Sequence, residues 1–207
     1  MKVVLVNVHG TIPALRYGGV ERVMWWLGRE LSTRGHEVTY LVRGGSCPFA
    51  RVIRHDPRLP LEPQIPSDAD VVHVQHVLPD GESIARPRLI TLHGPGSREV
   101  ELDRDTVFVS RDHAARFGST RFVHNGIDWD GYGPPSLDAP RSWVHFLGDG
   151  AWKVKNLPGA IRVAGLAGEE LHVAGGFRLN FRIWWFRIEL LPRLRVVLDP
   201  RKVLRTR

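Results

Sequence analysis

The stretch YGGVERVMWWLGRELSTRGHEVTYLV, residues 17–42, carries the clearest structural signal in the sequence. Its apolar side chains recur at the i, i+3, i+4 spacing of one helix face, which predicts a helix over residues 20–34. Gly35 ends this helix. Residues 36–42 are rich in Val, Leu and Tyr, and they predict a strand directly after the helix.

A short apolar run precedes this stretch, and several more follow it. Residues 2–8 predict a buried strand, so residues 2–42 form a strand, loop, helix and strand of parallel type. Further predicted strands, separated by short helical or loop segments, are residues 69–74, 88–92, 106–109 and 121–123. This rhythm predicts an α/β protein with a Rossmann-like, doubly wound parallel sheet. Residues 58–68 contain three prolines and predict a surface loop.

Glycine and proline concentrate in residues 129–141 without any periodicity, which predicts a linker. The α/β pattern then restarts with predicted elements in the order strand, helix, strand, at residues 143–147, 157–167 and 170–174. We therefore expect an N-terminal domain over residues 1–138 and an incomplete second α/β unit over residues 139–207.

The formal net charge of +7 is confined to a C-terminal tail, residues 178–207, which holds nine Lys or Arg and two acidic residues. The rest of the chain carries 20 of the 29 basic and 20 of the 22 acidic side chains, so it is neutral overall. The body of the protein therefore lacks the excess of positive charge typical of nucleic-acid-binding proteins, and no nucleic-acid partner is predicted.

Cysteine content and hydropathy indicate the compartment. A single cysteine, Cys47, makes no disulfide within the chain, which fits a reducing environment. No apolar run approaches the roughly 20 residues of a membrane span. We expect a cytoplasmic protein. Aromatic and aliphatic residues interleaved with Arg in the tail would suit the inner face of an anionic membrane. The core of a truncated domain explains them better, because their periodicity is neither 2 nor 3.6.

The pair Gly18-Gly19 stands directly before the predicted helix. Glycines let the backbone turn tightly and approach a ligand closely, and the free N–H groups at a helix N-terminus attract anions. A phosphate would bind well there, although the glycines could equally serve only to shape a turn. The pattern is not G-x-G-x-x-G, so a nicotinamide dinucleotide is not supported and no cofactor is predicted.

Five segments occur in an order that resembles family 4 of the retaining glycosyltransferases. They are residues 17–42, LITLHG (89–94), FVSRDHAARFG (108–118), FVHNGID (122–128) and FLGDGAWKVKNLPGAIRVAG (146–165). The resemblance implies a GT-B fold, in which an N-terminal Rossmann-like domain takes the acceptor and a C-terminal domain holds a nucleotide-sugar donor. In the family the donor domain continues far beyond the position of Gly176 and includes a paired-glutamate segment. The present sequence has no such pair up to Arg207, so the resemblance implies a truncated donor domain.

The resemblance also implies roles for four residues. Gly18 and Gly19 match the loop that lies against the donor phosphate, and Lys155 matches a lysine that neutralises the donor diphosphate. His93 would be the catalytic-cleft residue near the transferred sugar or the acceptor. Without the resemblance, His93 would be a hydrogen-bonded histidine at a strand end, and Lys155 a solvated lysine before a helix. Many relatives carry a second basic group upstream of this lysine, which the chain lacks unless Lys153 substitutes.

Three functions follow from these expectations. The first is transfer of a sugar from a nucleotide diphosphate to a glycan or lipid-linked acceptor, without a metal, since His73 and His76 lie on opposite faces of a predicted strand and no further ligands are evident. The second is a non-catalytic, truncated homologue that binds acceptor or nucleotide. The third is a protein similar to the nucleotide-sugar epimerases, which share the two-domain arrangement.

Overall fold

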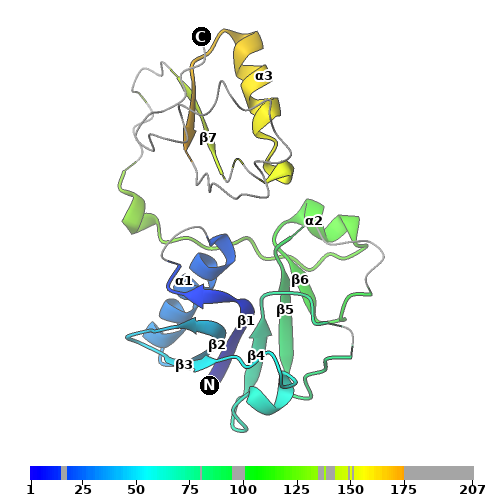
Figure 1. The fold of residues 1–207 in the computed structure, drawn as a ribbon. Helices are drawn as coiled ribbons and strands as arrows, with labels where there is room; N and C mark the ends of the chain where they lie inside the picture. The colour runs from blue at the N-terminus through cyan, green and yellow to red at the C-terminus, as the bar shows by residue number, and fades with distance from the viewer. Residues whose placement is uncertain are drawn as a thin grey trace. The chain divides into compact units, whose positions relative to one another are not determined.

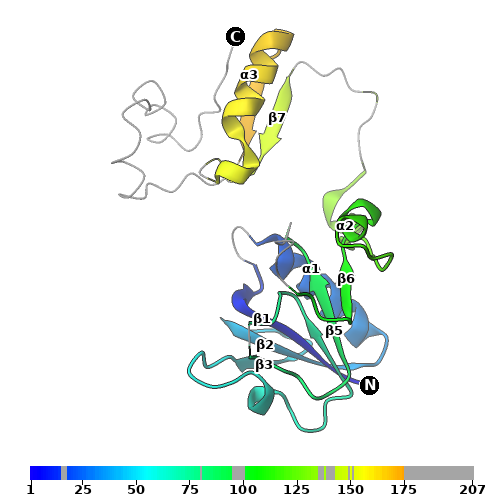
Figure 2. The same ribbon diagram turned by 90° about the vertical axis from the view of Figure 1, so that its right-hand side faces the viewer.

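The computed structural model describes residues 1–14, 18–79, 81–94, 101–134, 138, 143–148, 150 and 152–174. The chain divides into two compact units, Met1–Gly133 and Pro134–Arg207, which are described separately below (Figures 1 and 2). The tail expected to contact membranes, residues 178–207, lies outside the described residues.

The first unit is built on a six-stranded, fully parallel sheet with the strand order β3-β2-β1-β4-β5-β6 (Figure 1). The strands are β1 (Lys2–Ile12), β2 (Glu37–Gly45), β3 (Arg51–Arg54), β4 (Val71–Val74), β5 (Arg88–Leu92) and β6 (Thr106–Phe108). This is the strand order of the doubly wound Rossmann fold. The prediction of an α/β protein with a Rossmann-like parallel sheet is therefore confirmed.

Strand β1 extends further than the sequence predicts. After an irregularity between Asn7 and Thr11, the strand resumes its pairing with β2, so that Thr11 lies opposite Gly44 and Ile12 opposite Gly45. The prediction ended the strand at Val8 because the polar and glycine residues that follow resemble a turn. The extension carries β1 beyond its last pair with β4, Val6 to Val74, while β2 accompanies it to Gly45.

Helix α1 (Gly19–Thr33) covers one face of β1 and β2 (Figure 2). Its Met24 is fully buried in a cluster with Leu5 and Tyr40. The helix ends where predicted, since Gly35 has a φ of +82°, in the left-handed region that favours glycine. The helix also contacts the end of the unit, because Arg29 Nη2 donates a hydrogen bond to Asp128 Oδ2 at 2.7 Å.

The opposite face of the sheet is covered by the segment predicted to be a surface loop. This segment contains a 3₁₀ helix, η1 (Glu62–Gln64), and its Leu61 and Ile65 are buried against Val6 and Val74 of the sheet. The prediction of a surface loop is wrong for these two side chains, because its three prolines bend the chain without keeping it in solvent. The segment thus supplies part of the core that a crossover helix would supply elsewhere.

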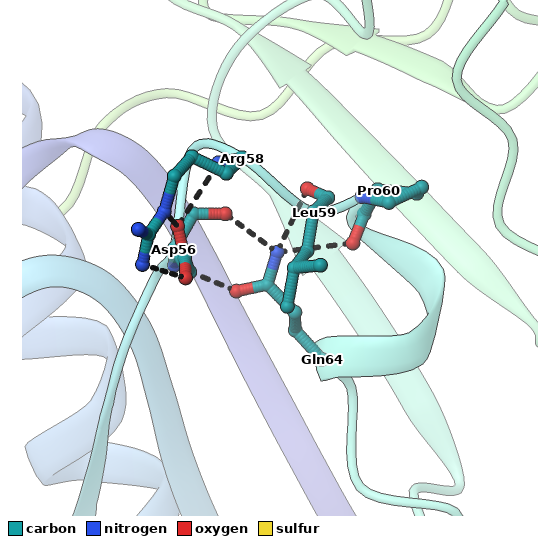
Figure 3. A network of polar contacts seen from close by, with 5 residues as sticks. All are labelled: Asp56, Arg58, Leu59, Pro60 and Gln64. Carbon is teal, nitrogen blue, oxygen red and sulfur yellow. Dashed lines mark hydrogen bonds and ion pairs between the residues drawn. The ribbon is translucent and has the colours of Figure 1, made fainter.

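Gln64 holds this segment in place (Figure 3). Its Nε2 donates to the carbonyl oxygens of Asp56, Leu59 and Pro60, each at 3.0 Å, and its Oε1 accepts from the Asp56 N–H at 2.8 Å. The Asp56 carboxylate in turn accepts from the Arg58 guanidinium at 3.0 and 2.9 Å. One amide side chain therefore forms hydrogen bonds with four backbone atoms of this segment.

Replacing Gln64 by alanine is expected to lower the free energy of unfolding by about 2 kcal/mol, because the partly buried hydrogen bonds to the Asp56 N–H and carbonyl oxygen are lost, together with the exposed ones to Leu59 and Pro60. Chemical denaturation of the purified chain measures this loss. Arg58→Ala is the matched control within the same network: its ion pair with Asp56 is solvent-exposed, and we expect a loss below about 1 kcal/mol. Equal losses in the two variants would contradict the assignment of Gln64 as the central residue.

The last strand region of the first unit differs from the prediction. Residues 121–123 form a single bridge, Phe108 to Phe122, instead of a strand. Between Phe108 and Phe122 the chain forms the helix α2 (Arg111–Arg116). Ser110 caps its N-terminus: the Ser110 Oγ accepts a hydrogen bond from the His113 N–H at 3.1 Å. A short 3₁₀ helix, η2 (Trp129–Tyr132), follows near the end of the unit.

The described part of the second unit is one β-α-β element. Two parallel strands, β7 (Val144–Leu147) and β8 (Leu171–Ala174), are connected through the 3₁₀ helix η3 (Lys153–Lys155) and α3 (Leu157–Ala167). The strand, helix and strand predicted here are confirmed. Nowhere in the described ranges is a helix both long and apolar enough to cross a membrane.

Candidate ligand site at the carboxyl edge of the sheet

The carboxyl ends of the parallel strands in the first unit gather most of the residues to which the sequence assigns a role. The chain leaves β1 toward β2 on one side, while β4 lies on the other side of β1. Such a reversal of strand order opens a crevice beyond the strand ends, and ligands of doubly wound proteins bind in this crevice. His93 comes directly after β5; Gly18 is the N-cap residue and Gly19 the first residue of α1, the helix that follows β1.

His93 forms a hydrogen bond across neighbouring strand ends. Its Nε2 lies 2.8 Å from Oε1 of Gln75, which follows β4. An amide oxygen can only accept, so Nε2 carries the proton and Nδ1 is the acceptor atom of the ring. Burial lowers the pKa of His93, and so does the positive charge that His113 would carry nearby. The imidazole is therefore neutral at pH 7 and able to accept a proton or a hydroxyl hydrogen.

Two buried polar side chains also belong to this edge of the sheet, Gln75 and His113. Gln75 is 5% exposed and His113 is 4% exposed, yet Nε2 of each lacks a hydrogen-bond partner among the described residues. The pKa of His113 is lowered, first by burial and then by Arg116. A buried polar atom without a partner costs about 1–3 kcal/mol, and native proteins tolerate few of them. We call Gln75, His93 and His113 the carboxyl-edge triad.

His73 and His76 lie near the triad but have separate surroundings. His73 is within β4, and its Nε2 lies 2.7 Å from Thr91 Oγ1. His76 comes after the strand, edge-on to the His9 ring with centroids 5.3 Å apart, and neither of its ring nitrogens has a partner among the described residues. Burial lowers the pKa of both His73 and His76 to about 4. In the described ranges no group of three or more His, Cys, Asp or Glu is arranged to hold a metal ion.

The two glycines before α1 differ in their surroundings. Gly18 is buried, and a Cβ added there would lie 2.8 Å from Glu21 Oε2 and 3.1 Å from the Ala14 Cβ. Gly19 is exposed, and a Cβ there would meet no atom of the described residues within 4 Å. The fold therefore has room for a side chain at Gly19, and packing does not explain the glycine. Glu21 places its carboxylate beside the N-terminus of α1, where it competes with any other anion.

Lys155 belongs to the second unit, at the last position of η3. A Cβ added to Gly148, directly after β7, would lie 3.8 Å from its Cδ, so the lysine stem passes the carboxyl end of that strand. The next residue, Asn156, caps α3: its Oδ1 accepts from the Gly159 N–H at 3.2 Å. Lys155 thus adds a positive charge where the N-terminus of α3 already attracts anions.

The structure brings Gly18, Gly19 and His93 to the same edge of one sheet, while Lys155 stands at the corresponding edge of the other. Sequence reasoning missed Gln75 and His113. Their signal is local: Gln75 directly follows the end of β4, and His113 lies in the first turn of the helix that follows β6, at the edge where ligands of doubly wound proteins bind.

Strand order and site together define an α/β protein with a Rossmann-like sheet whose carboxyl edge carries several polar, histidine-rich side chains. No protein-family model matches the sequence, and no curated protein matches it either. The arguments about function below therefore depend on the chemistry of the two strand edges and on the sequence resemblance described above.

Proposed function

We propose that the chain is a retaining glycosyltransferase of the GT-B type, which moves a sugar from a nucleotide diphosphate donor to a glycan or lipid-linked acceptor. One observation carries the proposal. The exposed backbone of Gly19, with open space beside it, lies at the N-terminus of α1 and on the strand edge that also holds His93. An open glycine at a helix N-terminus admits a phosphate oxygen close to backbone N–H groups.

The chemical requirement of this reaction is stabilisation of negative charge on the departing diphosphate. Backbone N–H groups at Gly19 and the dipole of α1 provide fixed positive potential, and Lys155 provides a full charge on a flexible stem. Charge stabilisation of this kind is often the largest contribution to catalysis. Glu21 acts in the opposite sense at the N-terminus of α1.

The carboxyl-edge triad suits a sugar. A neutral His93 offers an acceptor nitrogen, the unpartnered Nε2 of Gln75 can donate, and the unpartnered Nε2 of His113 can donate or accept according to its tautomer. Sugar hydroxyls both donate and accept, and they would satisfy these atoms. In the proposed reaction His93 contacts the transferred sugar or the acceptor hydroxyl, and Gln75 fixes its ring and tautomer.

A non-catalytic binding protein is the second candidate, and Glu21 favours it. Its carboxylate lies against Gly18, at the position where a donor phosphate would approach. A chain that binds only an uncharged acceptor through the carboxyl-edge triad would not need an open anion site there. The nucleotide titration below separates the two candidates.

Calorimetric titration of the purified chain with UDP and with GDP tests the proposal. We expect micromolar binding of one nucleotide, and an affinity at least about tenfold lower for Lys155→Ala, since each tenfold corresponds to 1.4 kcal/mol and a charged hydrogen bond is worth about 1.5–3 kcal/mol. Arg162→Ala is the control, because it removes an exposed positive charge from α3 in the same unit. Absence of binding to both nucleotides, or equal weakening by the two variants, would refute the donor-site assignment.

A further inference from the structure

A pocket of about 670 Å³ lies at the other end of the carboxyl edge, beyond β1, β2 and β3. Its volume is in the range of small-molecule sites. The described residues that line it are Thr11, Ile12, Pro13, Arg43, Gly44, Gly45, Ser46, Val52 and Arg54. None of these residues belongs to the carboxyl-edge triad or to the glycine pair before α1.

Two arginines give this pocket its character. Arg43 is in the last part of β2 and Arg54 ends β3, with Val42 paired to Arg54 in the sheet register. Both side chains are exposed, and neither forms an ion pair with a carboxylate in the described part of the chain. Asp56, two residues after Arg54, accepts two hydrogen bonds from the Arg58 guanidinium (Figure 3). Both arginines line the pocket, and its described lining has no acidic side chain.

Two neighbouring glycines of the pocket, Gly44 and Gly45, differ in the space around their backbone. Gly45 has a φ of +124°, and a Cβ there would lie 1.8 Å from the Ile12 carbonyl oxygen, to which the Ser46 N–H donates at 3.0 Å. Only glycine fits this contact, which joins the end of β2 to the end of β1. At Gly44, by contrast, a Cβ would meet nothing within 4 Å in the described residues, so this backbone borders free space.

We propose that this pocket binds a phosphomonoester group. Two guanidinium groups match the double negative charge and the several acceptor oxygens of a phosphomonoester, and arginine recognises phosphate through paired N–H donors. The hydroxyls of Thr11 and Ser46 add neutral donors. Ile12 and Val52 provide an apolar wall for the uncharged remainder of the ligand. A carboxylate carries one charge and two oxygens, and would leave more of these donors unused.

The inference does not depend on the glycosyltransferase proposal, because the pocket is separate from the glycine pair and from Lys155. If the chain is a transferase, the phosphate would belong to the acceptor, and that further statement rests on the proposed function. Binding of a phosphomonoester without nucleotide tests the pocket alone. The UDP and GDP titration with Lys155→Ala tests the donor site, so failure of one leaves the other standing.

The test is titration of the full chain with glucose 1-phosphate, followed by calorimetry, in parallel with flotation on phosphatidylcholine vesicles with and without phosphatidic acid. We expect at least tenfold weaker binding for Arg43→Gln and for Arg54→Gln, and loss of binding for Gly44→Leu, which fills the pocket. Arg51→Gln is the matched control: it removes an exposed arginine from the opposite end of β3 and should retain full affinity.

The two arms identify the source of the phosphate. If the chain binds glucose 1-phosphate and the pocket variants weaken this binding, the ligand is a soluble phosphomonoester. If the chain binds only the vesicles that contain phosphatidic acid, and the same variants weaken that binding, the ligand is a lipid headgroup. No binding of either probe at millimolar concentration overturns the proposal. So does an equal loss of affinity in Arg51→Gln and Arg54→Gln, since the attraction would then come from general surface charge.

Discussion

Lowering the pH from 6.5 to 4 is expected to reduce the free energy of unfolding of the first unit by several kcal/mol. His73 and His76 have a pKa of about 4 in the folded chain because burial disfavours their charged form, against 6.5 in the unfolded chain. Each shift corresponds to a difference on the order of 3 kcal/mol, at 1.36 kcal/mol per pKa unit. These two residues make the fold sensitive to acid.

The sign follows from proton binding. Between pH 6.5 and about 4 the unfolded chain binds protons at His73 and His76 that the folded chain excludes, so stability rises with pH in this range and is constant above it. Urea denaturation at half-unit intervals of pH measures the slope. His76→Phe keeps an aromatic ring beside His9, and His73→Gln keeps a hydrogen-bonding group beside Thr91, while each removes one titrating group.

Each of these variants should therefore flatten part of the pH dependence. His124→Gln is the control, because His124 is exposed, and it should leave the slope unchanged. A free energy of unfolding that stays constant from pH 6.5 to 4 in the unaltered chain would show that neither histidine is buried as described.

Gly28→Ala is expected to lower the free energy of unfolding by about 3 kcal/mol, although alanine favours a helix over glycine by about 1 kcal/mol. A Cβ at this position would lie 2.0 Å from Tyr40 Oη and 2.6 Å from Tyr40 Cζ. Tyr40 is fully buried and donates from its hydroxyl to the Trp25 carbonyl oxygen at 3.2 Å. The ring has no free direction, so α1 must move away from the sheet.

Gly19→Ala is the matched control at the start of the same helix. With open space at that position, we expect a change within about 1 kcal/mol of the unaltered chain. Combining Gly28→Ala with Tyr40→Phe removes the closest of the two contacts, and should recover part of the loss. Thermal unfolding of the four proteins checks both statements, and a Gly28→Ala chain as stable as Gly19→Ala would rule out the close approach of helix and strand.

Much of the fold could be predicted because the main elements bury one face each. Helix α1 and helix α3 repeat apolar residues at helical spacing, and β5 is a five-residue run between breaks. Strand β3 was missed because arginines stand at both ends of RVIR, leaving too short an apolar run. Its pairing with β2, which the local sequence does not encode, makes it a strand.

The candidate site could be predicted only where one residue carries the signal. The glycine pair and His93 stand out because each occupies the boundary of an element. Gln75 and His113 could not be found in this way, because they belong to other elements: Gln75 follows β4 and forms a hydrogen bond with His93, and His113 lies in α2. The arginine pocket was missed for the same reason: β2 and β3 must pair before Arg43 and Arg54 face one cavity.

The position of β1 has a consequence during synthesis on the ribosome. Among the strands of this sheet β1 is the first to be synthesised; it occupies the middle of the sheet, and its Val3 pairs with Val71 of β4. The β1-α1-β2 segment can form early, but at about 5–20 residues per second β4 emerges only several seconds later. During that interval one side of β1 presents unpaired N–H and C=O groups, which is the kind of edge that recruits strands of other chains. The nascent chain is therefore most prone to aggregation before residue 74 has left the exit tunnel.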